Sequence, residues 1–187
     1  ISASLVGSEM CIRDRIQTGK DVHDFHVGDK VVSNGGHAEY VTVSQNLCSR
    51  IPEGTPEKEA AFTVLGSIAL HGLRLSETTL GSKIVVIGLG VVGQLVCRLA
   101  EAQGSEVIGV DPDDKRTLDR ENFYTSIEDA INDKSINSEN VDAVIITAAS
   151  SSNEPIEVAT KIARNKAKIV VVGDIPLNIS RNEFYYK

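Results

Sequence analysis

The stretch from Lys83 to Asp111 constrains the fold of this chain more than any other. It begins with a short apolar run rich in β-branched residues, which is typical of a strand buried on both faces of a parallel sheet. A complete G-x-G-x-x-G follows at Gly88, Gly90 and Gly93. Apolar residues then recur at helical spacing, and a second apolar run ends at the aspartate. This order predicts a β-α-β unit.

The three glycines have separate roles in such a unit. Gly88 allows the tight turn out of the strand, Gly90 lets the backbone approach a pyrophosphate, and Gly93 lets the helix pack close to the sheet. The helix starts without a Ser, Thr, Asp or Asn cap, so its first N–H groups can bind an anion. Asp111 lies 23 positions after Gly88, near the offset of about 20 residues expected for an acid that binds ribose.

Two other interpretations of the glycines are weaker. One is a structural glycine turn in a β-α-β unit without a ligand, which is disfavoured because strand, glycines, helix, second strand and terminal acid all appear in order. A P-loop is excluded, because Gln94 and Leu95 stand where Lys and Ser/Thr would contact phosphate and magnesium. The stretch therefore predicts a dinucleotide site.

The pattern of alternating elements continues after Asp111. A short strand is expected at residues 123–124, then a helix capped by Ser126, with buried strands at 141–147 and 168–172. A helix over 155–164, capped by residue 152 or 153, separates the last two strands. The prediction is an α/β fold with a doubly wound parallel sheet, as in Rossmann domains.

In such a sheet, ligands bind beyond the carboxyl ends of the strands. These ends carry Gly88, Asp111, Thr147-Ala148 and Gly173-Asp174. We expect all of them to face one crevice.

The residues before the central stretch divide into three segments. Residues 1–15 have no helical or strand periodicity and resemble translated sequencing-adapter read-through, so we expect them to be non-native. Residues 16–56 are β-rich. Residues 57–82 are helical, with Thr55 as a cap and Gly66 as a break between two helical pieces.

The isolated polar residues of the N-terminal part are not predicted to form a metal site or a catalytic pair. His23, Asp24 and His26 have no established zinc spacing, and His37 with Glu39 is more typical of a surface pair than of an acid and base. The cysteines at 48 and 97 are interpreted as small apolar fillers. No metal site is predicted.

The composition excludes several classes of protein. The chain has 187 residues, of which 41% are hydrophobic and 24% charged, typical of a soluble globular protein. Its net charge of −7 argues against nucleic-acid and anionic-membrane partners. No apolar run approaches a membrane span, and three scattered cysteines fit a reducing, cytoplasmic compartment.

Together these segments resemble the medium-chain dehydrogenase/reductases, the zinc-type alcohol dehydrogenase-like superfamily. The resemblance covers residues 16–187 and rests on VGDKV, GHAEY, EAAFTVLGSIALHGLR and GLGVVG. It is strongest for the N-terminal part of the bi-domain oxidoreductases, through SNGGHAEYV, NLCSRIPEG, SNEPIEVA and SRNEFY. It implies a partial GroES-like catalytic domain at 16–56, hinge helices at 57–82 and a Rossmann domain at 83–187.

The resemblance also implies roles for individual residues. The backbone of Gly90, Val91 and Val92 would contact pyrophosphate, and Asp111 and Arg116, with Lys115 beside them, would lie at the adenosine ribose. The remaining positions would be Ser67 near the nicotinamide and Thr147 with Ala148 along the cofactor. No catalytic residue is identified, and the residues present do not support zinc.

The predicted function is NAD(P)-dependent hydride transfer between nicotinamide and an alcohol or carbonyl substrate, with a sugar-related substrate as one option. NAD is favoured over NADP, because the Asp111 carboxylate suits a ribose diol and repels a 2′-phosphate. Alternatives are a zinc-independent quinone or enoyl reductase and a non-catalytic dinucleotide-binding module.

The resemblance further implies that the chain is a fragment. We expect its parent to be a homo-oligomer, with a fused Gfo/Idh/MocA-type domain as an option, and its last sheet strand to lie beyond residue 187. The fragment alone is expected to be inactive and, because strand 168–172 presents an apolar edge, prone to aggregation.

Overall fold

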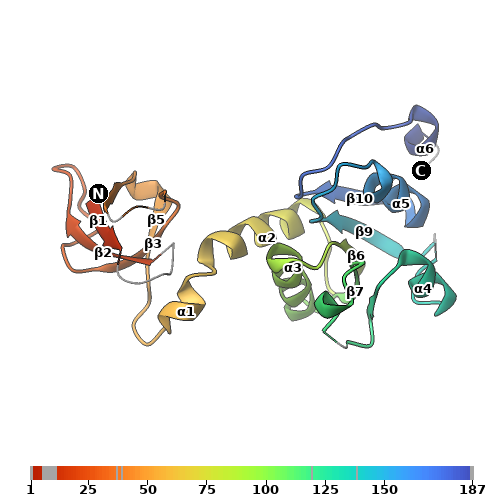
Figure 1. Cartoon of the computed structure of the whole chain (residues 1–187), viewed down its shortest axis with the longest axis horizontal. Helices are drawn as coiled ribbons and strands as arrows, with labels where there is room; N and C mark the ends of the chain where they lie inside the picture. Colours follow the sequence, from red (N-terminus) through yellow and green to blue (C-terminus); the bar gives the residue numbers. More distant parts are fainter. Residues whose placement is uncertain are drawn as a thin grey trace. The chain divides into compact units, whose positions relative to one another are not determined.

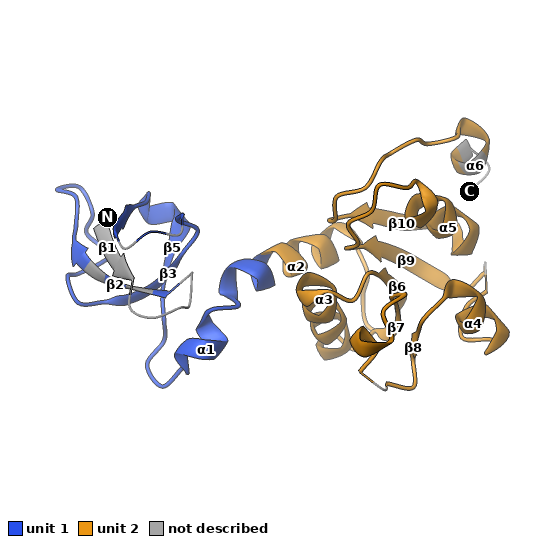
Figure 2. Cartoon of the chain, viewed as in Figure 1, with its two compact units in different colours: residues 1–67 blue, residues 68–187 orange. Residues whose placement is uncertain are grey.

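The structure, a computed structural model, describes residues 2–5, 12–36, 38, 40–118, 120–137 and 139–185; the side chains of residues 2–5, 13, 15, 183 and 185 are outside that description. The chain consists of two compact units, residues 1–67 and residues 68–187 (Figure 2). This division falls within the predicted hinge helices. The predicted domain bounds stay predictions.

The first unit is built on a five-stranded antiparallel sheet with the order β4-β1-β2-β3-β5. Its strands are β1 (Ser2–Leu5), β2 (Ile12–Gln17), β3 (Lys30–Ser33), β4 (Tyr40–Thr42) and β5 (Cys48–Arg50), the last preceded by the 3-10 turn η1 (Gln45–Leu47). Ile12, Val32 and Ala60 form a small core. This sheet agrees with the β-rich, GroES-like part predicted before the Rossmann domain.

Strands at both ends of segment 1–15 were not predicted. The β1 strand pairs with β2 and β4, and Ile12 opposite Val32 is 5% exposed. Backbone pairing satisfies N–H and C=O groups whatever the side chains are, which is why side-chain periodicity did not reveal these strands. The non-native origin of the segment stays a prediction. His37 and Glu39 lie outside the described residues.

Two helices follow, α1 (Glu57–Ala60) and α2 (Thr63–Leu75). The break lies at Ala61 and Phe62, so the predicted break at Gly66 is wrong. Gly66 is helical, and its N–H donates to the Phe62 carbonyl at 2.7 Å. The N-cap of α1 is Pro56, without a side-chain cap, so the prediction of Thr55 as the cap is also wrong.

The second unit is built on a five-stranded parallel sheet with the order β10-β9-β6-β7-β8 (Figure 1, with β8 labelled in Figure 2). The strands are β6 (Lys83–Ile87), β7 (Glu106–Val110), β8 (Phe123–Tyr124), β9 (Val141–Ile146) and β10 (Ala163–Val171). They are joined or followed by α3 (Val91–Ala102), η2 (Asp114–Arg116), α4 (Ile127–Asn132), α5 (Glu154–Ile162) and α6 (Arg181–Tyr185). The chain winds from β6 to β8 and then returns to β9, so the doubly wound prediction is confirmed.

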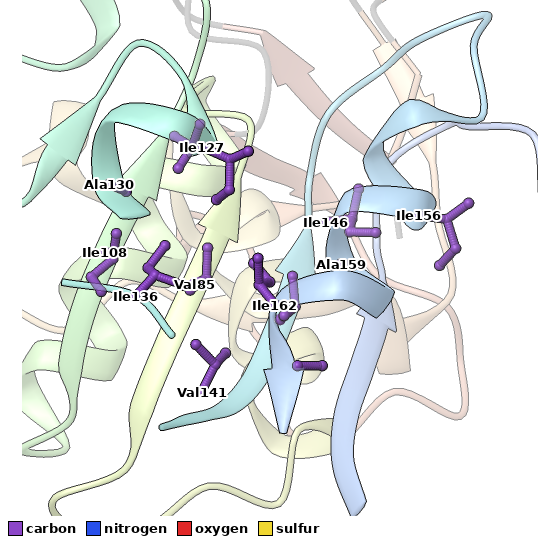
Figure 3. Packing of buried hydrophobic residues seen from close by; sticks show 13 residues of the cluster. Val85, Ile108, Ile127, Ala130, Ile136, Val141, Ile146, Ile156, Ala159 and Ile162 are labelled. Carbon is purple, nitrogen blue, oxygen red and sulfur yellow. The ribbon is translucent and has the colours of Figure 1, made fainter. Parts of the chain in front are cut away.

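Helices cover both faces of this sheet. On one face, residues of α2 and α3 pack against Ile84, Val86 and Ile145. On the other, residues of α4 and α5 pack against Val85 and Ile146 (Figure 3). Neighbouring residues of one strand thus enter opposite cores, which explains why β6 is apolar without alternation.

The local predictions after β7 hold with two adjustments. Ser126 caps α4, because its side chain accepts from the N–H of Asp129. Asn153 is the N-cap of α5, but its side chain bonds Glu157 and Asn178 instead of capping the helix. The β10 strand begins at Ala163, earlier than predicted, with a register shift before it pairs regularly with β9.

Asp142 ties three strands together at their amino ends. Its Oδ2 accepts from the Lys83 N–H at 2.7 Å, and its Oδ1 accepts from Arg164 Nε at 2.8 Å. Partial burial opposes ionisation, but these two hydrogen bonds outweigh it and lower the pKa of Asp142. The carboxylate therefore contributes stability that depends on pH.

We expect Asp142→Asn to lower the free energy of unfolding by about 1 kcal/mol at neutral pH. Because the folded pKa is depressed, the native contribution is complete above the unfolded pKa of about 3.9 and is lost as pH falls through the folded value. The variant's deficit should therefore shrink towards about pH 2, as measured by urea unfolding. Glu139→Gln, at an exposed acidic residue, is the control. A deficit that does not change with pH would contradict this assignment.

Candidate dinucleotide-binding site

The glycine turn is a place of very close approach between β6, α3 and the end of β9. Gly88 has φ +95°, and a Cβ there would lie 2.6 Å from the backbone nitrogen of Ala148. A Cβ on Gly93 would lie 2.0 Å from the Gly88 carbonyl oxygen. Thr147 Oγ1 donates to that same oxygen at 2.6 Å. The roles predicted for Gly88 and Gly93 are thus visible in the packing.

Gly90 has a different environment. It is the N-cap of α3, with φ −65°, and apart from its chain neighbours and the backbone of α3 no described atom lies within 4 Å of the position that a Cβ would take. The first N–H groups of a helix have no intrahelical acceptor, and here the N-cap has no side chain to supply one. The open space over Gly90 therefore leaves the positive end of α3 accessible to an anion.

A cavity of about 550 Å³ lies beyond the carboxyl ends of the parallel strands. Six of the predicted site residues line it: Gly88, Gly90, Asp111, Arg116, Thr147 and Ala148. The others are outside its lining: Val91, Val92, Gly93 and Lys115 in the same unit, and Ser67 in the first unit. The cofactor contacts predicted for all of these residues, inside and outside the lining, stay predictions.

Gly173 and Asp174 do not line this cavity, contrary to the expectation of one shared crevice. A Cβ on Gly173 would lie 2.0 Å from the Ala148 carbonyl oxygen. The carbonyl of Asp174 accepts from the Ser150 N–H at 3.0 Å. The end of β10 is therefore packed against the segment that follows β9.

Asp111 is the most constrained polar residue of the site. It is 3% exposed, and its Oδ2 accepts from the Leu89 N–H at 2.7 Å. Its Oδ1 accepts from the Asp113 N–H at 2.9 Å. The carboxylate is therefore fixed by the backbone on both sides. Oδ1 keeps acceptor capacity for a ligand hydroxyl, because a carboxylate oxygen accepts two hydrogen bonds.

Arg116 places a positive charge at the same end of the cavity. Its Nη1 lies 3.3 Å from Asp111 Oδ2, and its Nε lies 3.4 Å from Asp113 Oδ2. The side chain is half exposed, so the pair is open to solvent on one side. Lys115 precedes it in η2 with an exposed side chain.

Two helix starts were missed as parts of the site. The segment from Thr125 to Glu128 opens α4, and Glu154, Pro155 and Val158 belong to the first turns of α5. Both helices follow strands whose carboxyl ends meet the cavity. The topology rule for parallel sheets could have found them, but no motif in the sequence marks them.

The described part of the chain supports neither a metal site nor a reactive thiol at Cys97. No group of three His, Cys, Asp or Glu residues there could hold a metal ion. Near His26, Arg50 Nη2 lies 3.3 Å from Nδ1, and a guanidinium there disfavours a metal cation. Burial, and then Glu101, raises the pKa of the Cys97 thiol to about 12, so Cys97 is an inert core residue.

No helix within the described ranges is long and apolar enough to cross a membrane.

The switch point of a doubly wound sheet, an open helix N-terminus and a buried strand-end acid define a Rossmann-type nucleotide-binding unit. Residues 84–179 match the TrkA-N domain. The chain belongs to this family, and the relatives and structural neighbours described next are zinc-type medium-chain dehydrogenase/reductases.

Two relatives have names that indicate sugar-related substrates. D-guloside 3-dehydrogenase of Escherichia coli is 37% identical over 107 residues, which are 55% of this chain and 31% of the relative. 2-Dehydro-3-deoxy-L-galactonate 5-dehydrogenase of Pseudoalteromonas atlantica is 30% identical over 145 residues, 71% of this chain and 40% of the relative. The chain thus spans 31% and 40% of the length of these two curated relatives.

Solved structures share the fold. Galactitol-1-phosphate dehydrogenase from Escherichia coli has a TM-score of 0.74 at 19% identity, covering 98% of this chain and 70% of that one. A protein from Sinorhizobium meliloti, bound to NADP, has a TM-score of 0.75 at 18% identity, covering 99% of this chain and 72% of that one. At such identities the likeness concerns the fold alone.

The glycine geometry yields a paired prediction. Gly93→Ala should lower the free energy of unfolding by about 3 kcal/mol, because its methyl group would force α3 away from the Gly88 carbonyl. Gly90→Ala should change it by less than about 0.5 kcal/mol, since the methyl group meets open space at an ordinary φ. Equal losses in denaturant unfolding would refute the distinction.

Proposed function

We propose that this chain is the cofactor-binding part of an NAD-dependent oxidoreductase. The observation that carries the proposal is the cavity joining Gly90, Asp111 and Thr147 at the switch point of the sheet. Its two ends match the two needs of a dinucleotide: bare backbone at a helix start for phosphate, and a fixed carboxylate for ribose.

Different residues would contact different parts of the cofactor. The N–H groups of Gly90, Val91 and Val92 would hold the pyrophosphate, and Asp111 with Arg116 would hold the adenosine ribose, with Lys115 nearby. Thr147, Ala148 and Ser67 would lie towards the nicotinamide. When bound, this cofactor accepts or donates a hydride, and the protein supplies orientation and electrostatics.

Asp111 supports NAD over NADP. Its carboxylate can accept a hydrogen bond from a ribose hydroxyl, and its negative charge would repel a 2′-phosphate. Arg116 is the observation that favours NADP as a second candidate, because its half-exposed guanidinium lies at the same place.

The substrate proposed for the whole protein is a sugar-related alcohol or its carbonyl form. The two relatives named above, a glycoside dehydrogenase and a sugar-acid dehydrogenase, support this class. The rival is a zinc-independent quinone or enoyl reductase, since the CurK enoyl reductase shares the fold with a TM-score of 0.76 at 20% identity. A further alternative is a dinucleotide-binding module without turnover. In the whole protein, Cys and His-Glu zinc-ligand motifs would favour the alcohol-dehydrogenase type, and their absence would favour the reductase.

We infer a cytoplasmic, homo-oligomeric parent, with a fused Gfo/Idh/MocA-type domain as an option from the bi-domain resemblance. This chain alone is proposed to be inactive, because it contains less than half of each relative's length.

The proposal predicts that the chain binds NADH more tightly than NADPH in a fluorescence titration. Gly90→Ala should weaken NADH binding at least about tenfold, because its methyl group occupies the path of the pyrophosphate. Since the fold of this variant is expected to be intact, its loss of binding would report on the site. Tighter binding of NADPH would refute the NAD preference, and binding of neither nucleotide would refute the proposed function.

A second prediction concerns the reaction. A contiguous parent protein should reduce NAD with a member of a panel of polyols, glycosides and sugar acids, followed by NADH absorbance. Turnover of enones or quinones, with none on the sugar panel, would favour the reductase alternative. Nucleotide binding without turnover on either panel would favour the non-catalytic module.

A further inference from the structure

A closed ring of hydrogen bonds joins the glycine turn to the end of β7. The Leu89 N–H donates to Asp111 Oδ2 at 2.7 Å, and Arg116 Nη1 contacts the same oxygen at 3.3 Å. Gln94 closes the ring from α3. Its Nε2 donates to the Arg116 carbonyl at 2.7 Å and to the Leu89 carbonyl at 3.4 Å. The ring connects the phosphate end of the cavity to the ribose end.

The other atom of the Gln94 amide makes this residue unusual. Among the buried side-chain atoms that the structure describes, Gln94 Oε1 is the one without a hydrogen-bond partner. A buried acceptor without a partner opposes folding, and a leucine of similar size would avoid that penalty. The chain nevertheless has glutamine here. The benefit of the side chain must therefore come from its donor, which reaches Arg116 and Leu89.

We propose that Gln94 is a positioning residue that holds Arg116 against Asp111 and so favours a ribose diol over a 2′-phosphate. This inference rests on the proposed function. Arg116 is the last residue of η2, a single short turn, and its side chain is half exposed. The hydrogen bond from Gln94 to the backbone carbonyl of Arg116 therefore fixes the main-chain position from which the Arg116 side chain extends.

The consequence for specificity follows from charge. While Arg116 is held on Asp111, its positive charge is shared with that carboxylate and with Asp113. If the anchor is removed, η2 can shift and the guanidinium becomes available to a 2′-phosphate, which it binds strongly. Loss of Gln94 should thus weaken NADH binding more than NADPH binding.

The test uses Gln94→Leu in the full chain, with NADH and NADPH titrated by fluorescence. NADH affinity should fall about fivefold, and the ratio of the NADPH to the NADH dissociation constant should fall at least about threefold. In an Arg116→Ala background the same substitution should change NADH affinity less than about twofold, because the coupling runs through Arg116.

Gln103→Leu is the matched control. Gln103 Nε2 donates to the Thr78 carbonyl at 2.7 Å, so it makes the same kind of bond just beyond the opposite end of α3. This control should leave the ratio unchanged. Gln94→Met, which also lacks the donor but keeps an unbranched chain, should reproduce the effect of leucine and provides the test if the leucine variant does not fold.

The outcomes separate this inference from the proposed function. Unchanged ratios in both Gln94 variants, or an equal effect in the Arg116→Ala background, would overturn the role of Gln94 alone. A wild-type chain that binds neither nucleotide would overturn the proposed function and this inference with it.

Discussion

The contact between Gly93 and the Gly88 carbonyl is the constraint on which the rest of the second unit depends. A Cβ on Gly93 would lie 2.0 Å from that oxygen, so α3 can reach the end of β6 only because no side chain intervenes. This approach brings the start of α3 to the switch point of the sheet. It also places Thr147, at the end of β9, where its hydroxyl can donate to the same carbonyl at 2.6 Å. One steric relation thus aligns three elements around one cavity.

Charged and polar groups around Asp111 add to the alignment that this packing produces. The buried carboxylate of Asp111 is held by the N–H groups of Leu89 and Asp113, and Arg116 balances its charge. A buried carboxylate requires such partners, because an unpaired charge is expensive to remove from water. The backbone that positions the helix start therefore also orients the acid. Gln94 adds a second link between the helix start and the segment of Arg116, through its hydrogen bonds to the carbonyls of Leu89 and Arg116.

Much of this arrangement was predictable because the signals are local. The order of strand, glycines, helix and acid predicted the β-α-β unit, and the apolar runs predicted the parallel sheet. The predictions that failed, at Gly66 and at strand β1, also have local causes. Gly66 was expected to break a helix, yet glycine in a helix costs only about 1 kcal/mol, so α2 continues through it. Strand β1 escaped prediction because its pairing is carried by backbone groups that side-chain periodicity does not report.

The amino-acid sequence alone determined the class of fold, the identity of the glycines and the acid, and the resemblance to dehydrogenases. These properties follow from residue order and spacing. The tertiary structure decided which candidates share a cavity: Arg116 and Thr147 line it, while Gly173 and Asp174 do not. It also showed that residues at the starts of α4 and α5, including Glu128 and Glu154, line this cavity. Such neighbours are far apart along the chain, and only the sheet order and helix packing bring them together.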